Sequence, residues 1–473
     1  MVQRGVLQRI SKMMAYFSTK VVFIMGLCLL FTACFKPYTR FATANDVLVV
    51  KNKDKTAGQA NEKKQEEDEK SPCENFENYA PNKMYPEHTP MRLLRLNFHF
   101  INRIDSSHNF KPEEGRAFVH ELLDMANKKL ETNAKMMLPN NNNTPVLPTR
   151  YQYVLSKNEA IPNDDGIYFH YNDTLNVCNK DDQRGKSVYS VFNNERFDRY
   201  GVRKGEVINV FLLEHPLDSI ASDTYKASAD GIGKSDWAKI LGAYQHYQKW
   251  KKEDHKEPMT YNAKFFAGLL NHEIGHCLGL WHTWNGNDGC DDTPKNLNLW
   301  NAPKNSSTRN QLSNNVMDYN AYRSAFTPCQ LARIHYRFAS NDLFQRKKLI
   351  KKWCTYNPKA TIVINEKEEV VWNSAKDIEG DIIIEKGASL KVLCTVAVPK
   401  NAKIVLKDDA KLIVDGGNIT NVCDEKWLGV ELIKTGWAKP KVILQNHGSL
   451  TEIIYDWQQN NIIKNEPNTL SCP

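Results

Sequence analysis

One stretch of the chain, HEIGHCLGLWH over residues 272–282, combines residue types that bind metals and move protons. On a helix, His272 and His276 lie four residues apart and project from one face, so both imidazoles can reach one Zn²⁺ at about 2.0–2.1 Å. Gly279 can adopt a backbone conformation that other residues resist, and the turn that it allows lets His282 approach the same ion. Three protein ligands leave a fourth position for water, which is typical of a catalytic zinc site.

Glu273 directly follows the first of these histidines, and a carboxylate at that position can act as general base for a zinc-activated water. The opposite face of the expected helix carries Leu270, Ile274 and Cys277, which predicts that this face packs into a core. We therefore interpret Cys277 as a small buried hydrophobic residue rather than a ligand. With 13 His and 23 Gly in 473 residues, a chance match at the five fixed positions has odds of roughly 10⁻⁵ to 10⁻⁴ per chain, so unrelated surface histidines are a poor explanation.

The spacing of these residues resembles the long zinc signature of the metzincin metallopeptidases. The resemblance implies zinc as cofactor and a tight turn that places a methionine beneath the metal. The segment NNVMDY over 314–319 fits such a turn. By resemblance, Met317 is the methionine of the turn and Tyr319 a hydrogen-bond donor to the transition state. Spacing alone assigns neither role, because a methionine in such a string can also be an ordinary core residue.

Two further segments, GCDDTP over 289–294 and FTPCQLAR over 326–333, look like the pappalysin (cytophagalysin) group of metzincins. The resemblance covers roughly residues 90–350 and implies protein or peptide substrates. It also allows Ca²⁺ as a second cofactor, without assigning residues to it, and a disulfide between Cys290 and Cys329. The chain departs from the group in its short connection from the histidine motif to the methionine turn, which holds one cysteine.

The motif needs a scaffold, and hydrophobic patterning predicts one over residues 90–352. Residues 94–100 alternate apolar and polar side chains, which predicts a half-buried strand with His99 in a structural role on its polar face. Apolar side chains at helical spacing predict helices over 113–133 and 263–279. Further strands are expected over 151–155, 166–170 and 207–213. This order of elements implies a mixed α/β or α+β domain. With the resemblance to metzincins, we expect an α+β, metzincin-like catalytic domain with a twisted mixed sheet and an active-site helix.

The sequence pattern changes past residue 355, where short segments rich in β-formers replace the helical spacing of apolar residues. Residues 382–392 align with 404–414, and 442–450 reads as a third copy. A repeat of strand, small-residue turn and strand with a period near 20 is typical of a β-solenoid, in which each rung buries its apolar face against the next. We expect an all-β, solenoid-like domain over 355–473; the alternative is a small β-sandwich with coincidental similarity.

The N-terminus predicts export. Basic residues precede an apolar run over 21–31, which is too short to span a bilayer comfortably and fits the core of a signal peptide over 1–33. Small residues before Cys34 resemble a bacterial lipobox, which implies cleavage there and a lipid anchor on Cys34 in a bacterial membrane, at the cell surface or facing the periplasm. An ordinary signal peptide or an uncleaved anchor are the alternatives. Residues 34–89 include a charged stretch without aromatic residues, so we expect a flexible tether or a short pro-segment.

Composition sets limits on the class of protein. Apolar residues make up 41% and charged residues 25% of the chain, which excludes wholesale disorder. The formal net charge is +8, and four of the basic residues lie in the expected signal peptide, so nothing points to nucleic acid. Eleven cysteines are too few for a disulfide scaffold.

These observations predict a secreted or surface-anchored zinc endopeptidase that hydrolyses peptide bonds through a zinc-activated water, with Glu273 as general base. The first alternative is a surface-binding or structural protein with an inactive peptidase domain, and the second is a zinc-dependent hydrolase of non-peptide amides. Some metzincins are kept latent by an upstream cysteine bound to the zinc. Cys73 lies upstream, but its surroundings match no latch motif, so we expect a disulfide or a free thiol there.

Overall fold

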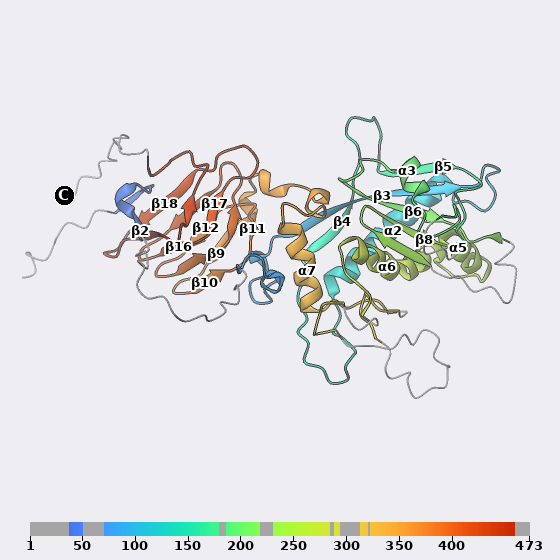
Figure 1. Cartoon of the computed structure of the whole chain (residues 1–473), viewed down its shortest axis with the longest axis horizontal. Coiled ribbons are helices and arrows are strands. Elements are labelled where there is room, and N and C mark those ends of the chain that lie inside the picture. Colours follow the sequence, from blue (N-terminus) through green and yellow to red (C-terminus); the bar gives the residue numbers. More distant parts are fainter. Residues whose placement is uncertain are drawn as a thin grey trace, which may run out of the picture.

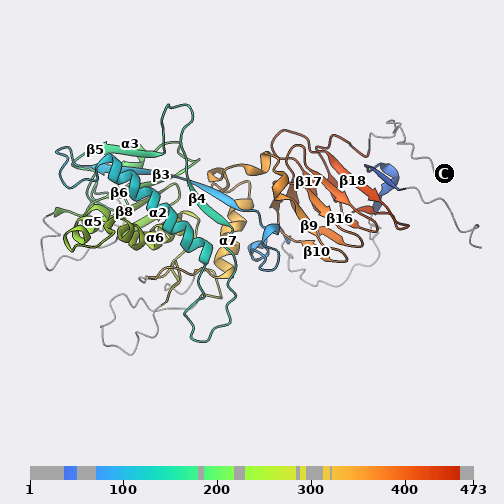
Figure 2. The same cartoon turned by 180° about the vertical axis from the view of Figure 1, so that it is seen from behind.

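The structure is a computed structural model, and it places a mixed α/β unit beside an all-β unit (Figure 1, Figure 2). It describes residues 37–50, 71–178, 186–217, 230–283, 288–293, 313–319 and 322–458. The expected signal peptide and Cys34 lie outside these residues. Within them, no helix combines the length and the apolar character needed to cross a membrane.

The α/β unit is built on a twisted sheet around the long strand β3 (Arg92–Asn102). The neighbours of β3 run parallel to it: β4 (Tyr151–Leu155) and β5 (Ile167–Tyr171) pair with successive halves of one edge, and β6 (Ile208–Leu213) pairs with the other. β8 (Trp237–Leu241) continues the sheet in parallel, and β7 (Gly231–Lys234) closes it as an antiparallel edge strand. The expected strands are therefore present, and β7 and β8 are additions.

Two long helices cover one face of this sheet, as Figure 2 shows. They are α2 (Pro112–Thr132) and α6 (Pro258–Cys277), and both begin with proline at the first turn, where its missing N–H costs nothing. The apolar side of β3 packs with their buried side chains into one core. The short helices α3 (Glu195–Tyr200), α5 (Ala243–Lys252) and α7 (Pro328–Ala339) complete the unit.

The second face of β3 is also buried, which corrects the expectation of a half-buried strand. Asn97 and His99 have no exposed surface. Buried polar groups need hydrogen-bond partners. Nδ1 of His99 lies 3.0 Å from Nε2 of His170, and Nε2 of His99 lies 2.9 Å from Oδ1 of Asn209. A second apolar cluster, which includes Phe211 and Trp237, lies on this side of the sheet.

The C-terminal unit is all-β and consists mainly of three parallel sheets, to each of which the chain adds one strand per turn. The first sheet holds β9 (Ile362–Ile364), β12 (Ile382–Ile384), β15 (Lys403–Leu406) and β18 (Gly429–Lys434). The second holds β10 (Glu369–Trp372), β13 (Ser389–Val392), β16 (Lys411–Asp415) and β19 (Lys441–Gln445). The third holds β11 (Lys376–Asp377), β14 (Thr395–Ala397), β17 (Asn418–Thr420) and β20 (Ser449–Leu450). The buried side chains of all three sheets share one core.

The strand register agrees with the first two sequence repeats and corrects the third. Ile382 pairs with Ile404, and Leu390 pairs with Leu412, as the aligned copies require. The alignment places Val442 at the position of Ile404, so the two should pair, but Val442 pairs with Leu412. The strands of the third copy therefore belong to the second and third sheets, one sheet later than the alignment requires. The reason is that the segment between β16 and β19 is longer than one period of the repeat.

The N-terminal segment is not simply a tether, which corrects the expectation for 34–89. β1 (Tyr38–Phe41) pairs antiparallel with β18, and β2 (Val47–Val50) extends the second sheet beside β19. Farther along, Cys73 forms a disulfide with Cys394. Backbone pairing and this disulfide attach both described parts of the segment to the all-β unit. Most of the charged stretch lies outside the described residues.

Candidate active site

Helix α6 places the first two histidines, and its end places the third. The helix stops at Cys277, and Gly279 takes a left-handed conformation with φ +83°. The Gly279 N–H donates to the His276 carbonyl, and the Leu280 N–H donates to Gly275, both at 2.9 Å. This turn reverses the chain so that His282 returns toward the helix.

The three histidines meet at their Nε2 atoms. His272 and His276 are 3.2 Å apart at Nε2, and Nε2 of His282 lies 3.2 Å from the first and 3.0 Å from the second. Zn–N bonds are about 2.0–2.1 Å long, so one ion can reach all three corners of a triangle of this size. The donor set and its geometry therefore fit zinc.

Hydrogen bonds on the far side of two rings fix their orientation. Nδ1 of His272 lies 2.6 Å from the carbonyl of Val316, and Nδ1 of His276 lies 2.9 Å from the carbonyl of Leu280. Because a carbonyl only accepts, Nδ1 carries the proton in each ring and Nε2 keeps its lone pair. Burial lowers the pKa of all three imidazoles, that of His282 to about 3. Neutral rings are the form that binds a metal.

Glu273 lies next to the triad but points to the edge strand of the sheet. Its side chain is buried, and burial raises its pKa to about 8, while the backbone N–H of Gly233 in β7 opposes the shift. A Cβ on Gly231 would lie 2.6 Å from Oε1 of Glu273, and one on Gly233 would collide with the Glu273 carbonyl. Two glycines in β7 therefore let this strand approach the active-site helix.

Met317 and Tyr319 contact different parts of the site. Met317 is fully buried, and its sulfur occupies the space that a side chain on Gly275 would fill, directly against α6. The Tyr319 ring centroid is 4.7 Å from that of His282 and 6.1 Å from that of His272. The turn thus supports the helix with one residue and presents a phenol to the site with the other.

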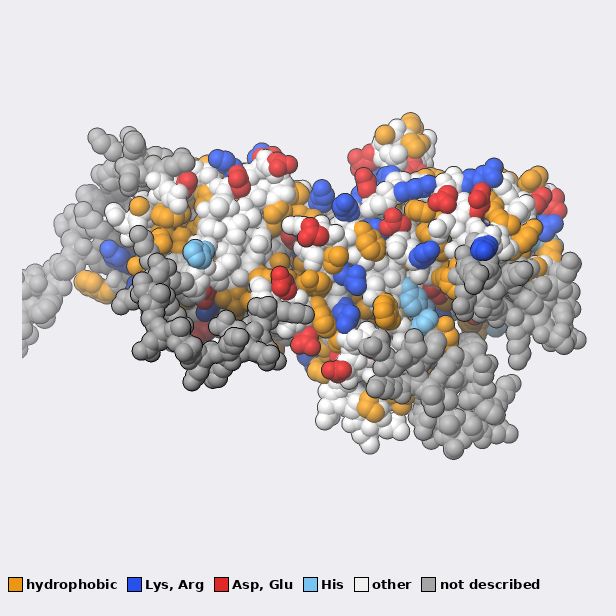
Figure 3. All heavy atoms as spheres, in the orientation of Figure 1, with side chains coloured by type: hydrophobic (Ala, Val, Ile, Leu, Met, Phe, Trp, Pro, Cys, Tyr) orange, Lys and Arg blue, Asp and Glu red, His pale blue; other side chains and the backbone are white. Residues whose placement is uncertain are grey.

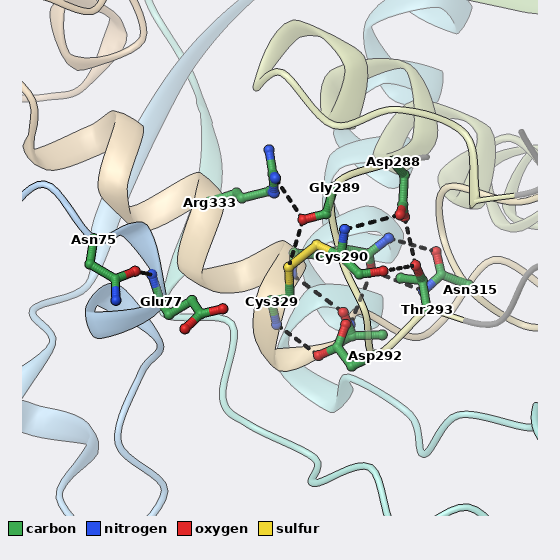
Figure 4. The surroundings of a disulfide bond; sticks show 12 residues. Asn75, Glu77, Asp288, Gly289, Cys290, Asp292, Thr293, Asn315, Cys329 and Arg333 are labelled. Atoms are coloured by element: carbon green, nitrogen blue, oxygen red, sulfur yellow. Dashed lines mark hydrogen bonds between the residues drawn. A yellow bond between two sulfur atoms is a disulfide. The ribbon is translucent and has the colours of Figure 1, made fainter. Parts of the chain in front are cut away.

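A disulfide joins Cys290 to Cys329 at the start of α7, with sulfurs 2.03 Å apart (Figure 4). Arg333 of the same helix donates to the Gly289 carbonyl at 2.6 Å, and Asp292 accepts from the Cys329 N–H at 2.9 Å. The pair is the possible disulfide that the sequence analysis named. These bonds attach the described part of the loop that follows the histidine motif to α7.

Sequence reasoning missed Arg323 and strand β7. Arg323 is partly exposed. Burial raises the pKa of Glu273, and the charge of Arg323 opposes this rise. Burial lowers the pKa of each histidine of the triad, and the charge of Arg323 adds to this lowering. No periodicity marks a single arginine in a loop or the short GIGK strand. The Gly-X-Gly pattern at 231–233 was the available signal, since glycine in a strand often marks a close backbone approach.

Among the described residues, two groups could geometrically hold a metal: the histidine triad and Cys290, Asp292 and Cys329. The two sulfurs of the second group form the disulfide and are not available as thiolate ligands. Neither group offers a site for the Ca²⁺ that the resemblance allows, and among the described residues no Ca²⁺ ligands are assigned. Cys73 is bonded to Cys394 and is therefore not a latch on the histidines.

The chain resembles known peptidases at the level of a family and of solved structures. Residues 243–339 match the family described as pregnancy-associated plasma protein-A, a peptidase family. Tannerella forsythia mature mirolysin in complex with a cleaved peptide is 16% identical, covers 55% of this chain and 96% of its own, and gives a TM-score of 0.35. A promirolysin mutant from the same organism is 15% identical, with coverage of 55% and 84% and a TM-score of 0.35. No curated protein matches the chain.

The matched segment runs from α5 to the end of α7 and contains the histidine triad, Glu273 and Met317. The family model and the site agree on the same residues of the chain. Over residues 243–339, which hold these site residues, this chain is similar to the peptidase family described as pregnancy-associated plasma protein-A.

Proposed function

We propose that the protein is a zinc endopeptidase that is exported and held on a bacterial membrane by lipid on Cys34. The observation that carries the peptidase proposal is the meeting of three neutral Nε2 atoms within 3.2 Å of one another beside a buried carboxylate. Three histidine nitrogens are the protein donor set of one class of catalytic zinc site, and an acid beside them can act as the general base.

His272, His276 and His282 would hold the metal. When bound, zinc supplies Lewis-acid activation of water and of the scissile carbonyl. Glu273 takes the proton of the attacking water on a carboxylate oxygen and delivers it to the leaving amine nitrogen. Burial raises the pKa of this carboxylate, and in its ionised form a carboxylate with a raised pKa is a stronger base than a solvated one. The Tyr319 hydroxyl is the candidate donor to the negative charge that develops on the carbonyl oxygen.

The substrate would lie extended along β7. In the described part of the chain, β7 pairs with β8 alone, so its other edge has backbone groups for one more strand. Adding a peptide strand to a sheet edge provides affinity through main-chain hydrogen bonds with little dependence on sequence. This arrangement brings the peptide past Glu273, which contacts the same strand.

The all-β unit is proposed to be a β-solenoid that serves as a spacer or a binding module. Three sheets that each gain one strand per turn support this proposal. Membrane attachment can be tested separately: Cys34→Ala should move the protein from the membrane fraction to the soluble exported fraction. Retention of the variant in the membrane would exclude the lipid on Cys34.

The peptidase proposal is tested with protein that begins at residue 35. We expect about one zinc per chain, cleavage of casein or gelatin, loss of cleavage on chelation and recovery when zinc is returned. A folded, zinc-loaded protein that cuts neither these proteins nor a diverse peptide library would support the alternative of a binding protein with an inactive peptidase domain.

A further inference from the structure

A cleft of about 620 Å³ lies between helix α7 and the all-β unit. Its volume is in the range of ligand pockets, about 300–1,000 Å³. Aromatic and cationic side chains line it, among them Phe76, Tyr79, Arg333, Tyr336 and Arg337. The Tyr79 and Tyr336 rings meet edge to face, with their centroids 5.2 Å apart. The Arg333 guanidinium lies over the Phe76 ring, 4.5 Å from its centroid, so the aromatic wall of the cleft is packed in place.

Arg333 and Arg337 lie one helical turn apart on α7, and each guanidinium covers a glycine. A side chain on Gly289 would collide with the Arg333 guanidinium, and one on Gly279 would collide with the other. Gly279 is the turn residue that leads to His282, so the cleft lies beside the loop that carries the third candidate zinc ligand. Figure 3 shows Lys and Arg side chains over α7 and, on the same face of the molecule, histidine side chains over α6. A polypeptide can therefore reach both places from one side.

Neither arginine forms an ion pair with a described residue. Arg333 donates to the Gly289 carbonyl at 2.6 Å, while its buried Nε has no hydrogen-bond partner. Its charge affects the pKa of Asp288, but no ion pair joins the two. Arg337 forms no hydrogen bond with any described residue, and its pKa is lowered by burial and then by the charge of Arg333. Because like charges one turn apart on a helix repel each other, an anion between them would be stabilising.

Three carboxylates also line the cleft, and none of them is paired with these two arginines. Asp377 accepts hydrogen bonds from Arg92 and Arg346. Glu74 and Asp342 are exposed, and neither belongs to an ion pair among the described residues. The cleft therefore offers guanidinium N–H groups that no carboxylate of the described chain occupies.

We propose that Arg333 and Arg337 bind a Glu or Asp side chain of a polypeptide in this cleft. That the polypeptide is a substrate rests on the proposed peptidase function, and the cleft is then an exosite beside the zinc triad. A guanidinium can hold a carboxylate through two parallel hydrogen bonds, and the aromatic wall can take up apolar parts of the neighbouring residues. The volume of the cleft favours such a segment over a single small ion.

The test measures the binding of short peptides to the zinc-loaded Glu273→Gln protein, which should not cleave them. The probes are a fluorescent peptide with two adjacent Glu residues at its centre and the same peptide with Gln, both with blocked ends. We expect the Glu peptide to bind roughly 10- to 100-fold more tightly, the range for hydrogen bonds to a charged group. Arg337→Gln in the same background should remove this preference. Arg199→Gln, which removes an exposed arginine of α3, is the matched control and should keep it.

Arg337→Lys, which keeps the charge but loses the planar fork, should reduce the preference several-fold and decides the result if the Gln variant does not fold. Equal affinity for the two peptides, or a preference that neither Arg337 variant changes, would overturn the proposal. Loss of the preference in Arg199→Gln would overturn it by showing attraction through net charge alone. Inorganic phosphate or succinate that binds in place of the Glu peptide would assign the cleft to a small free anion and also overturn it. Absence of cleavage by the wild type would contradict the proposed function and leave this binding result standing.

Discussion

Burial keeps imidazoles neutral in two different settings of this protein. At the triad, a low pKa, near 3 for His282, leaves the rings free to bind a metal. Outside it, His335 of α7 is buried and has a pKa of about 3, with its Nε2 2.8 Å from the Thr149 carbonyl. The same physical effect thus prepares ligands in one place and makes the fold sensitive to acid in another.

The acid sensitivity at His335 can be measured without reference to activity. Its pKa is near 6.5 in the unfolded chain and about 3 in the folded one, so the unfolded state takes up the proton first. Stability is therefore full above pH 6.5 and falls as the pH drops toward 3, by about 2 kcal/mol at pH 5 for this residue. Urea unfolding of wild type and His335→Gln at pH 7.5 and 5 should show a smaller loss in the variant; equal losses would contradict the assignment.

At the scale of elements, the active-site helix depends on close approach from two sides. The methionine turn packs against Gly275, and β7 packs against Glu273 through Gly231 and Gly233. At each of these positions a side chain would collide with another group. The helix is therefore held by contacts that hydrophobic periodicity does not record.

Gly233→Ala tests this arrangement. The new methyl group would meet the Glu273 backbone carbonyl, which cannot rotate away, so β7 must separate from α6. We expect loss of peptide cleavage and a clearly lower unfolding temperature. Gly205→Ala is the control, because no atom lies within 4 Å of its Cβ and only the left-handed backbone, φ +87°, opposes it, at roughly 1–2 kcal/mol. If the two variants behaved alike, the contact between β7 and α6 would not be required.

Long periodic segments were predictable from the sequence, and close approaches were not. The spacing of His272, His276 and His282 predicted which side chains would meet, because helix geometry and one glycine turn determine their direction. Strand β7 carries two glycines and no apolar alternation, and Arg323 lies in a loop, so neither gave a periodic signal. The pairing of β1 and β2 with the C-terminal sheets joins segments that are almost the whole chain apart, which local patterns do not encode.

At the scale of the whole molecule, a buried ion-pair network connects the two units. Asp377 of β11 accepts from Arg92 of β3 at 2.9 Å, and from two nitrogens of Arg346 at 2.7 and 2.8 Å. The side chains of Arg92 and Asp377 are each 7% exposed. Removal of one partner from a buried pair leaves an uncompensated charge, which is the costly case.

Asp377→Ala should therefore lower the free energy of unfolding by about 3–5 kcal/mol. Lys400→Gln removes one partner of the exposed pair with Glu425 and should cost less than about 1 kcal/mol. Urea unfolding of both variants measures the difference. Limited proteolysis should also cut Asp377→Ala faster between the two units. A cost for Asp377→Ala as small as that of the surface variant would show that the network does not hold the units together.

The most direct test of the proposed mechanism compares Glu273→Gln with His276→Ala. The amide nearly keeps the shape of the carboxylate but cannot take up a proton, so peptide cleavage should fall by about 10²–10⁴-fold or more. Zinc should remain at about one per chain, because Glu273 is outside the ligand group. His276→Ala should lose zinc and activity together. Near-normal turnover of Glu273→Gln, or loss of its zinc as readily as in His276→Ala, would contradict the role of Glu273 as general base.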